Sequence, residues 1–329
     1  MTNAILPMPP FEWQQSLWEE YYTRISENKL PHAYLLAGQD GIGVEDLALA
    51  MGQFLLCLSP LNQIACGRCR GCQLLHADTH PDLKRVHPEA PGKQIKVDQI
   101  REIGHFVDQT AQQGGYKVII LSPAESMNIN ASNALLKNLE EPAGKTVFLL
   151  VTHQNNRVLP TIRSRCSLVS LFSPPREESL AWLSSVGIED ADALLFEAGG
   201  APLLAKRWHD EGEFQERLAI LKDLVTVADR KLEPMAFAKK WAKQAPMQIL
   251  EPMLICVETI LARRLGQRAL PSHYEVVMRA LEHCKSAMMF RLRDRLCERK
   301  GQLRASPNLN APLFIEELVL DWSAIVCAA

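Results

Sequence analysis

In the first half of the chain, short apolar runs alternate with segments of helical periodicity. Trp13, Leu17, Tyr21 and Ile25 recur at helical spacing and predict a first amphipathic helix that ends before Pro31. Further helices are predicted at 44–57, 96–109, 130–141 and 158–164. Strands are predicted at 32–37, 82–87, 117–121, 146–152 and 167–171. Because strands alternate with helices, we expect a parallel, doubly wound α/β sheet up to about residue 173.

The pattern changes after two consecutive prolines, at 174 and 175. From there to about residue 208 it predicts short helices. Beyond residue 210 it predicts only long amphipathic helices, at 214–228, 234–243, 247–268, 272–300 and 314–325. This block shows no glycine-rich loop and no cluster of titratable residues, which is typical of a packing or assembly domain. We therefore predict three domains, at residues 1–173, 174–208 and 209–329.

Composition narrows the class of protein. With 47% hydrophobic and 22% charged residues, the chain is expected to be a soluble globular protein. Its net charge of −2 provides no global basic field, so any contact with DNA is expected to be local or made through partners. Residues 1–13 lack the pattern of a secretory signal, and no apolar run reaches the length that spans a bilayer. We expect a cytoplasmic protein with no membrane partner.

A glycine loop lies between the first predicted strand and the next helix. Gly38 and Gly43, with Gly41 between them, keep the spacing of the phosphate-binding pattern G-x-x-x-x-G-K-[ST]. Val44 stands in place of the lysine that contacts the β- and γ-phosphates, and Glu45 in place of the Ser/Thr that binds magnesium. Two lost charge-assisted contacts cost about 3–6 kcal/mol, or roughly two to four orders of magnitude in affinity. We expect no tight ATP binding, and at most a weak interaction through the loop's N–H groups.

A second ATPase feature is also missing. In phosphate-loop ATPases the strand at 117–121 would end in an acidic pair that holds magnesium and orients water. Here Ser122 and Pro123 follow the strand, and Glu125 is better explained as a loop residue or a helix cap. Two independent losses predict a domain that no longer hydrolyses ATP. The alternative is an active ATPase with an unusual loop, which would use Glu125 and a distant lysine such as Lys137.

Four of the nine cysteines fall close together, at Cys57, Cys66, Cys69 and Cys72. Two C-x-x-C steps that share Cys69, with a further thiol nearby, are typical of a closed tetrahedral zinc site. Four thiolates leave no open position on the metal, so this zinc would be structural. Reduced thiols or a redox pair are the alternatives, and His76 or His80 is a minor alternative to Cys57 as the fourth ligand.

Two pairs of arginines are candidates for contacts with phosphate groups. Arg163 and Arg165 follow the strand at 146–152, and they are either surface charges in ordinary ion pairs or candidates for an arginine finger. Such a finger would project into the nucleotide site of a neighbouring subunit. Arg68 and Arg70 lie beside the cysteines and raise a further hypothesis, a zinc-dependent module that binds nucleic-acid phosphates.

Several motifs together resemble the clamp-loader branch of the AAA+ ATPases. The motifs are the opening at 30–38, the cysteine cluster inserted after the following helix, T-H-P-D at 79–82, N-A-L-L-K-N-L-E-E-P at 133–142, and S-R-C at 164–166. The resemblance covers residues 10–208, and the helical remainder fits in layout. ATP-hydrolysing relatives keep the lysine and the acidic pair, so the resemblance is to a subunit that does not hydrolyse ATP.

The resemblance implies a RecA-like AAA+ domain with the zinc insert, a small helical lid and a helical collar. It also implies a pentameric bacterial DNA polymerase III clamp loader, formed with delta and tau/gamma subunits. This loader opens the sliding clamp and places it on primer–template DNA during replication. The chain would then be part of a DNA-directed DNA polymerase, a nucleotidyltransferase holoenzyme, without being an enzyme by itself.

The same resemblance assigns roles to individual residues. It implies that Arg165 is an arginine finger acting in trans, which can be worth about 10³–10⁵ in the rate of hydrolysis. It places Thr152 at the sensor-1 position. It also places Pro202 near the sensor-2 arginine, so a further phosphate contact would be absent.

Overall fold

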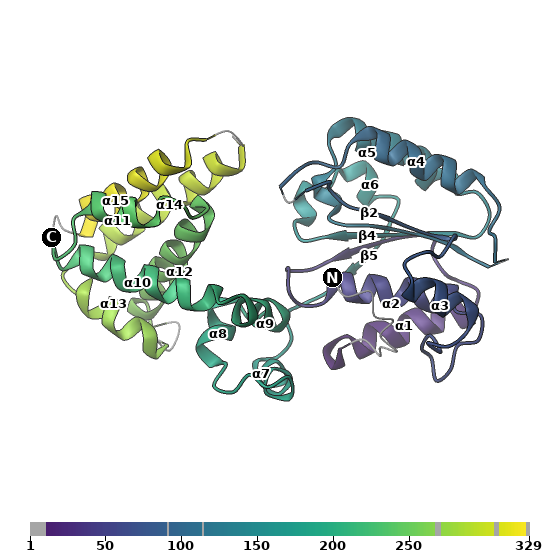
Figure 1. The fold of residues 1–329 in the computed structure, drawn as a ribbon, viewed down its shortest axis with the longest axis horizontal. Helices are drawn as coiled ribbons and strands as arrows, with labels where there is room; N and C mark the ends of the chain where they lie inside the picture. Colours follow the sequence, from purple (N-terminus) through teal and green to yellow (C-terminus); the bar gives the residue numbers. More distant parts are fainter. Residues whose placement is uncertain (1–10, 91, 114, 267–270, 306–308, 327–329) are drawn as a thin grey trace. The chain divides into compact units, whose positions relative to one another are not determined.

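The computed structural model describes residues 11–90, 92–113, 115–266, 271–305 and 309–326 (Figure 1). These residues form two compact units. The first extends to Trp182 and also includes Gly200–Leu204, and the second comprises Leu183–Gly199 and the chain from Ala205 onward. The three domains expected at 1–173, 174–208 and 209–329 stay a prediction.

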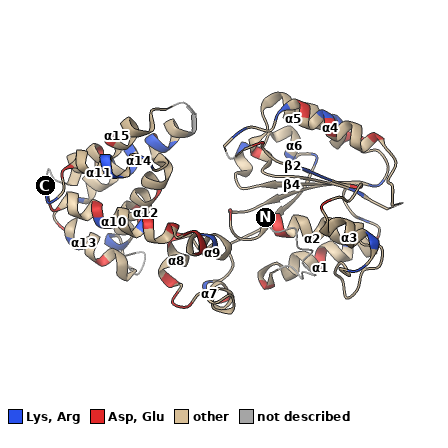
Figure 2. Cartoon of the chain, in the orientation of Figure 1, with Lys and Arg blue, Asp and Glu red and all other residues tan. Residues whose placement is uncertain are grey.

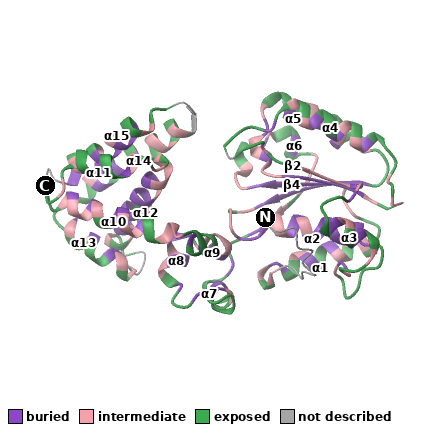
Figure 3. Cartoon of the chain, viewed as in Figure 1, coloured by how far each residue is buried: buried purple, intermediate pink, exposed green. Residues whose placement is uncertain are grey.

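The first unit is built on a five-stranded, wholly parallel sheet with the order β2-β3-β4-β1-β5. Its strands are β1 (Ala33–Ala37), β2 (Leu83–Val86), β3 (Lys117–Leu121), β4 (Thr146–Thr152) and β5 (Ser167–Ser170). Every residue of the three inner strands is buried, because helices cover both faces of the sheet (Figure 3). The predicted parallel α/β fold is thereby confirmed.

Helices lie on both faces of this sheet (Figure 1). On one face are η1 (Glu12–Gln14), α1 (Gln15–Ser26), α2 (Val44–Leu56) and α3 (Arg70–His76). On the other are α4 (Val97–Asp108), α5 (Ile129–Glu140) and α6 (Pro160–Arg163). Short 3-10 turns follow β3 and β4, at η2 (Ala124–Ser126) and η3 (Asn155–Arg157). Successive strand residues face opposite layers, so Tyr34 packs in the core with α1 and α2, while Leu35 packs with α4 and α5.

Beyond β5 the described residues contain helices and no strand. These helices are α7 (Arg176–Ser185), α8 (Asp192–Glu197), α9 (Pro202–Glu211), α10 (Glu213–Ala228), α11 (Pro234–Trp241), α12 (Pro246–Arg264), η4 (Ser272–Tyr274), α13 (Glu275–Ala280), α14 (Ser286–Ala305) and α15 (Ala311–Val326). Phe237, Trp322 and their neighbours form one core between α10, α11, α12, α14 and α15. The all-helical C-terminal region is as expected. Within the described residues, no helix is both long and apolar enough to traverse a bilayer.

The prediction of a single helix at 272–300 is wrong. The chain is not helical between α13 and α14, and Arg264 at the end of α12 donates hydrogen bonds to two carbonyl groups of this connecting segment. Its Nη2 donates to the carbonyl of Leu281 at 2.6 Å, and its Nη1 donates to the carbonyl of Cys284 at 2.5 Å. These bonds satisfy carbonyl groups that have no helical partner at a helix end. The pattern could not show the break, because the group that stabilises it comes from another helix.

The second unit contains a buried polar cluster around Glu197, the last residue of α8. Glu197 accepts hydrogen bonds from the Tyr274 hydroxyl at 2.5 Å and from His273 Nε2 at 3.0 Å, and it pairs with Arg217 at 3.8 Å. The Arg217 guanidinium also lies 4.1 Å from the ring centroid of Trp208. Burial and the Glu197 charge raise the pKa of Tyr274. Because a buried carboxylate is stable only when it is paired, the cluster holds α8, α10 and η4 together.

Candidate functional site

The glycine loop joins β1 to α2 at the carboxyl edge of the sheet. Gly41 and Gly43 have φ of +82° and +86°, a region that favours glycine. A Cβ at Gly41 would lie 2.4 Å from the Cβ of Leu204 in α9, and a Cβ at Gly43 would lie 2.6 Å from the ring of Phe11. Both glycines are therefore required by packing within this chain, whether or not a phosphate binds.

Side chains and backbone of the same unit hold the loop carbonyls. Trp13 Nε1 donates to the carbonyl of Ile42 at 3.0 Å, and Gln14 Nε2 donates to the carbonyls of Ile42 at 3.0 Å and Gly43 at 2.8 Å. The N–H of Leu203 donates to the carbonyl of Gly41 at 2.9 Å. Contacts from η1 and α9 therefore hold the loop in this conformation.

Val44 and Glu45 occupy the two positions where the phosphate-loop pattern has lysine and Ser/Thr. Val44 is fully buried in the apolar core between α1, α2 and the sheet. Glu45 accepts a hydrogen bond from the Ser122 hydroxyl at 3.0 Å and contacts His153 Nε2 at 2.8 Å. The positions of the lysine and of the magnesium ligand therefore hold a buried valine and a carboxylate that is already paired.

Glu125 and Lys137, the groups of the alternative ATPase hypothesis, lie in different places. The two Glu125 oxygens accept hydrogen bonds from the Thr152 hydroxyl at 2.7 Å and from the N–H of His153 at 3.0 Å. Lys137 is exposed on α5, which packs on the opposite face of the sheet from the α2 helix that follows the loop. Glu125 therefore joins the end of β3 to the end of β4, and this arrangement does not favour a catalytic pair.

His153 links these groups, and the sequence analysis missed it. Its Nδ1 lies 3.0 Å from the carbonyl of Gly38, and its Nε2 lies 2.8 Å from a carboxylate oxygen of Glu45. Burial opposes the charge on the ring, but the hydrogen bond and the charge of Glu45 prevail and raise the pKa of His153 to about 9. Burial likewise opposes the charge of Glu45, and the bond to His153 lowers the pKa of Glu45. The position of His153, directly after a buried strand, was the available signal.

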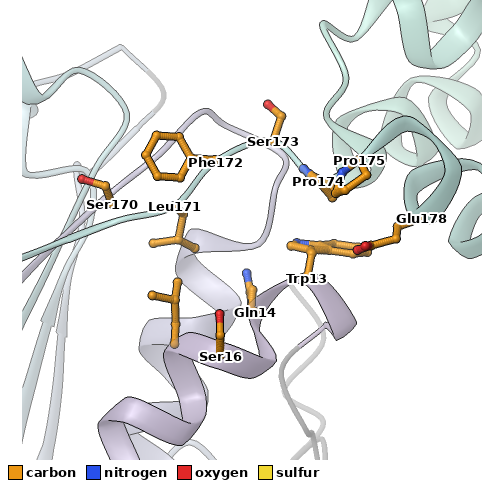
Figure 4. A pocket seen from close by; sticks show the side chains of 11 residues that line it. Trp13, Gln14, Ser16, Ser170, Leu171, Phe172, Ser173, Pro174, Pro175 and Glu178 are labelled. Atoms are coloured by element: carbon orange, nitrogen blue, oxygen red, sulfur yellow. The ribbon is translucent and has the colours of Figure 1, made fainter.

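A pocket of about 410 Å³ lies beside the loop (Figure 4). The Trp13 indole forms one wall, Pro174 and Pro175 lie across from it, and the Phe172 ring stands at another side. Phe172 is 80% exposed. Since Trp13 also binds a loop carbonyl, one wall of the pocket is built from a side chain that positions the loop.

The four predicted cysteines form one cluster. Their sulfur atoms all lie within 4.8 Å of one another. Cys57 and Cys69 are 3.8 Å apart at Sγ, and Cys66 and Cys72 are 3.9 Å apart. Four sulfur atoms that surround a zinc ion tetrahedrally at 2.3 Å would lie about 3.8 Å from one another. The two Sγ–Sγ distances of 3.8 and 3.9 Å agree with this value. The cluster could bind a metal ion such as zinc.

The surrounding groups support the cysteine ligand set. A hydrogen bond from Ser59 and backbone N–H groups lower the pKa of Cys66 to about 5, whereas burial raises the pKa of Cys72. His76 is exposed, and neither it nor His80 belongs to the group of possible ligands among the described residues. His80 Nδ1 instead accepts a bond from the N–H of Asp82 at 3.1 Å. The minor alternative with a histidine ligand is not favoured.

Arg165 lies between α6 and β5. Its Nη1 donates to the carbonyl of Thr161 at 3.0 Å, and its Nη2 pairs with Glu140 at the end of α5. Its side chain is 35% exposed, and Arg163 is also exposed. An intradomain ion pair is therefore present, and the role of Arg165 in a neighbouring subunit stays a prediction.

Arg68 and Arg70 are both exposed beside the cysteine cluster. Charged residues of both signs are interspersed along the helices of each unit (Figure 2). This agrees with the small net charge of −2. The hypothesis that these two arginines bind nucleic-acid phosphates also stays a prediction.

Two family models match the chain. One is described as DNA polymerase III, delta subunit, and matches residues 13–175, and the other is described as its C terminal and matches residues 211–324. DNA polymerase III subunit delta' of Pseudomonas aeruginosa is 38% identical over 325 residues, covering 96% of this chain and 98% of the relative. The subunit delta' of Escherichia coli K12 is 29% identical over 316 residues, covering 94% of each chain.

A solved structure of a DNA polymerase III, gamma subunit-related protein from Thermotoga maritima has a TM-score of 0.49 and 19% identity, over 94% of this chain and 99% of that one.

The family of the chain is assigned from the two family models and from the relatives found by sequence. The fold, the altered loop and these relatives define a protein of the clamp-loader class of AAA+ proteins. Within that class, the chain belongs to the family of DNA polymerase III delta-prime subunits, which act in DNA replication. The resemblance seen in the sequence is confirmed.

The Glu45–His153 pair predicts a specific pH dependence of stability. Because folding raises the pKa of His153 from 6.5 to about 9, its contribution is complete below pH 6.5 and is lost as the pH rises toward 9. We expect His153→Gln to lower the free energy of unfolding by about 1–2 kcal/mol at pH 6.5, allowing for solvent screening, and by less at pH 9. Urea unfolding at both pH values measures this difference. His105→Gln, at an exposed position of α4, is the control, and an equal effect of His153→Gln at both pH values would contradict the assignment.

Proposed function

We propose that this chain is the non-hydrolysing delta-prime subunit of a clamp loader and supplies Arg165 in trans to the ATP site of an adjacent subunit. The observation that carries the first part is the state of the glycine loop. A valine occupies the lysine position, and the carboxylate at the magnesium-ligand position is bound to Ser122 and His153. A polyphosphate would meet a carboxylate at the magnesium-ligand position and would lack both of the contacts that normally hold it.

The second part concerns the position of Arg165. A finger must be reachable from outside its own domain, and the Arg165 side chain is 35% exposed at the turn that follows α6. Its Nη1 and Nη2 are held by Thr161 and Glu140, so the guanidinium is positioned while part of it faces solvent. In an adjacent ATP site, such a group would stabilise the charge that develops on the phosphoryl oxygens.

The partners follow from the class of complex. We propose that the chain assembles with delta and tau/gamma subunits and reaches the sliding clamp and primer–template DNA through that complex. The near-neutral net charge and the interspersed charges support contact with DNA through the assembly rather than by this chain alone. As part of the DNA-directed DNA polymerase holoenzyme, the chain would contribute to assembly and not to nucleotide transfer.

We further propose that the cysteine cluster holds a structural zinc ion. All four ligands would be thiolates from Cys57, Cys66, Cys69 and Cys72, so no coordination position would be open to water or substrate. The N–H groups of Cys66, Cys69 and Cys72 lie 3.3–3.4 Å from cluster sulfurs and would stabilise thiolate charge. Such an ion would fix the segment between α2 and α3.

Arg165→Ala tests the proposed function in the reconstituted loader. We expect hydrolysis at the one ATP site that Arg165 serves to slow by about 10³, because the developing charge loses its guanidinium. Single-turnover kinetics in the presence of primed DNA would show this as a fraction of bound ATP that is hydrolysed slowly. Arg163→Ala is the matched control, and unchanged kinetics for Arg165→Ala would refute the role in trans.

Equilibrium binding of Mg·ATP to the isolated chain tests the loss of the nucleotide site. We expect no binding up to millimolar concentrations, because Val44 and Glu45 replace the two charge-assisted contacts. A hydrolysing motor subunit of the same loader provides the positive control. Micromolar affinity would reopen the hypothesis of an active ATPase with an unusual loop.

Metal analysis tests the zinc site. Protein purified without chelator is expected to contain one zinc per chain and to lose it on Cys72→Ser. Structural zinc sites contribute about 10–16 kcal/mol of apparent binding energy, so chelation should also lower the unfolding temperature. Cys297→Ser, at an exposed cysteine outside the cluster, should keep the metal. A zinc content well below one per chain would count against the proposal.

A further inference from the structure

We infer that Glu140 is a positioning residue for Arg165, an inference that rests on the proposed function of Arg165 as a finger in trans. Glu140 is the last residue of α5, and Arg165 lies at the turn between α6 and β5. The Arg165 guanidinium pairs through Nη2 with a carboxylate oxygen of Glu140. On its other side, Nη1 donates to the carbonyl of Thr161 at 3.0 Å. Two separate elements, α5 and α6, thus hold the two terminal nitrogens of one planar group.

This arrangement leaves donors for a ligand. A guanidinium carries five N–H donors in a fixed plane. The bonds to Glu140 and Thr161 use two of them, and a weaker contact joins Nη1 to the Ser164 hydroxyl at 3.5 Å. Within the part of the chain that the structure describes, the remaining donors, including Nε–H, have no partner and would donate to phosphate oxygens. Glu140 is half exposed and Arg165 about one third exposed, so a phosphate on a neighbouring chain could approach the pair.

The physical effect of Glu140 would be preorganisation. Arginine has a long side chain with many rotamers, and a finger acts only in those that direct its donors at the phosphate. A carboxylate that restrains one edge of the guanidinium removes unproductive rotamers before the ATP site of the partner is completed. Because the pair is exposed, its strength is modest, and a two- to fivefold effect on the rate is the expected scale.

The experiment compares Glu140→Ala and Glu140→Gln in the reconstituted loader, by single-turnover hydrolysis at the site that Arg165 serves. We expect Glu140→Ala to lower the rate constant two- to fivefold with an unchanged KM for ATP. Glu140→Gln keeps an acceptor oxygen and should restore part of the rate. Glu141→Ala is the matched control, because Glu141 is the next residue, is exposed, and forms no ion pair among the described residues.

The double variant separates positioning from effects on folding or assembly. In the Arg165→Ala background, Glu140→Ala should have no further effect on the rate. A further decrease there would overturn the inference, since Glu140 would then act without Arg165. A faster rate for Glu140→Ala alone would also overturn it, because Glu140 would then compete with the phosphate for the guanidinium.

The two proposals fail in different ways. If Arg165→Ala leaves hydrolysis unchanged, the proposed function is wrong and the inference about Glu140 falls with it. If Arg165→Ala slows hydrolysis while Glu140→Ala leaves it at the wild-type rate, only the positioning role is wrong. Gel filtration of each assembled loader verifies that the compared complexes contain the same subunits.

Discussion

The ion pair between Glu45 and His153 is the charged contact that ties α2 to the strand ends beside the glycine loop. It joins the start of α2 to the end of β4, and the second ring nitrogen of His153 reaches the carbonyl of Gly38 at the end of β1. In a working phosphate loop, the nucleotide and its magnesium supply the charges at this edge of the sheet. Here the side chains of Glu45 and His153 place a paired negative and positive charge at this edge.

The two glycines of the loop with positive φ are explained by packing. A Cβ at Gly41 would overlap Leu204 in the first turn of α9, and a Cβ at Gly43 would overlap Phe11 before η1, so close packing requires glycine at both positions. Glu125 lies at the carboxyl edge of the sheet, accepts hydrogen bonds from Thr152 and His153, and so links the ends of β3 and β4. The polar groups at this edge are therefore bonded to one another within the chain.

The two other candidate sites of the first unit, the cysteine cluster and the Arg165–Glu140 pair, lie away from the glycine loop. Three of the four clustered cysteines lie between α2 and α3 and Cys72 lies in the first turn of α3, while Arg165 and Glu140 lie just after α6 and at the end of α5. Cys66, Cys69 and Arg165 are each partly exposed, so both sites are partly open to solvent. This combination suits a subunit whose contribution is made in contact with other chains. In the second unit, the paired charge of Glu197 fixes helices to one another in the interior.

The sequence by itself determined the strands, most helices, the parallel sheet, the group of four cysteines and the presence of Val44 and Glu45 where the phosphate-loop pattern has Lys and Ser/Thr. These features depend on spacing along the chain, through hydrophobic periodicity, turn residues and motif positions. Only the tertiary structure decided the role of His153, which meets Glu45 across 108 residues, and the helix break that Arg264 stabilises from another helix. Those contacts join residues far apart in sequence, and no local pattern encodes which polar groups a fold brings together.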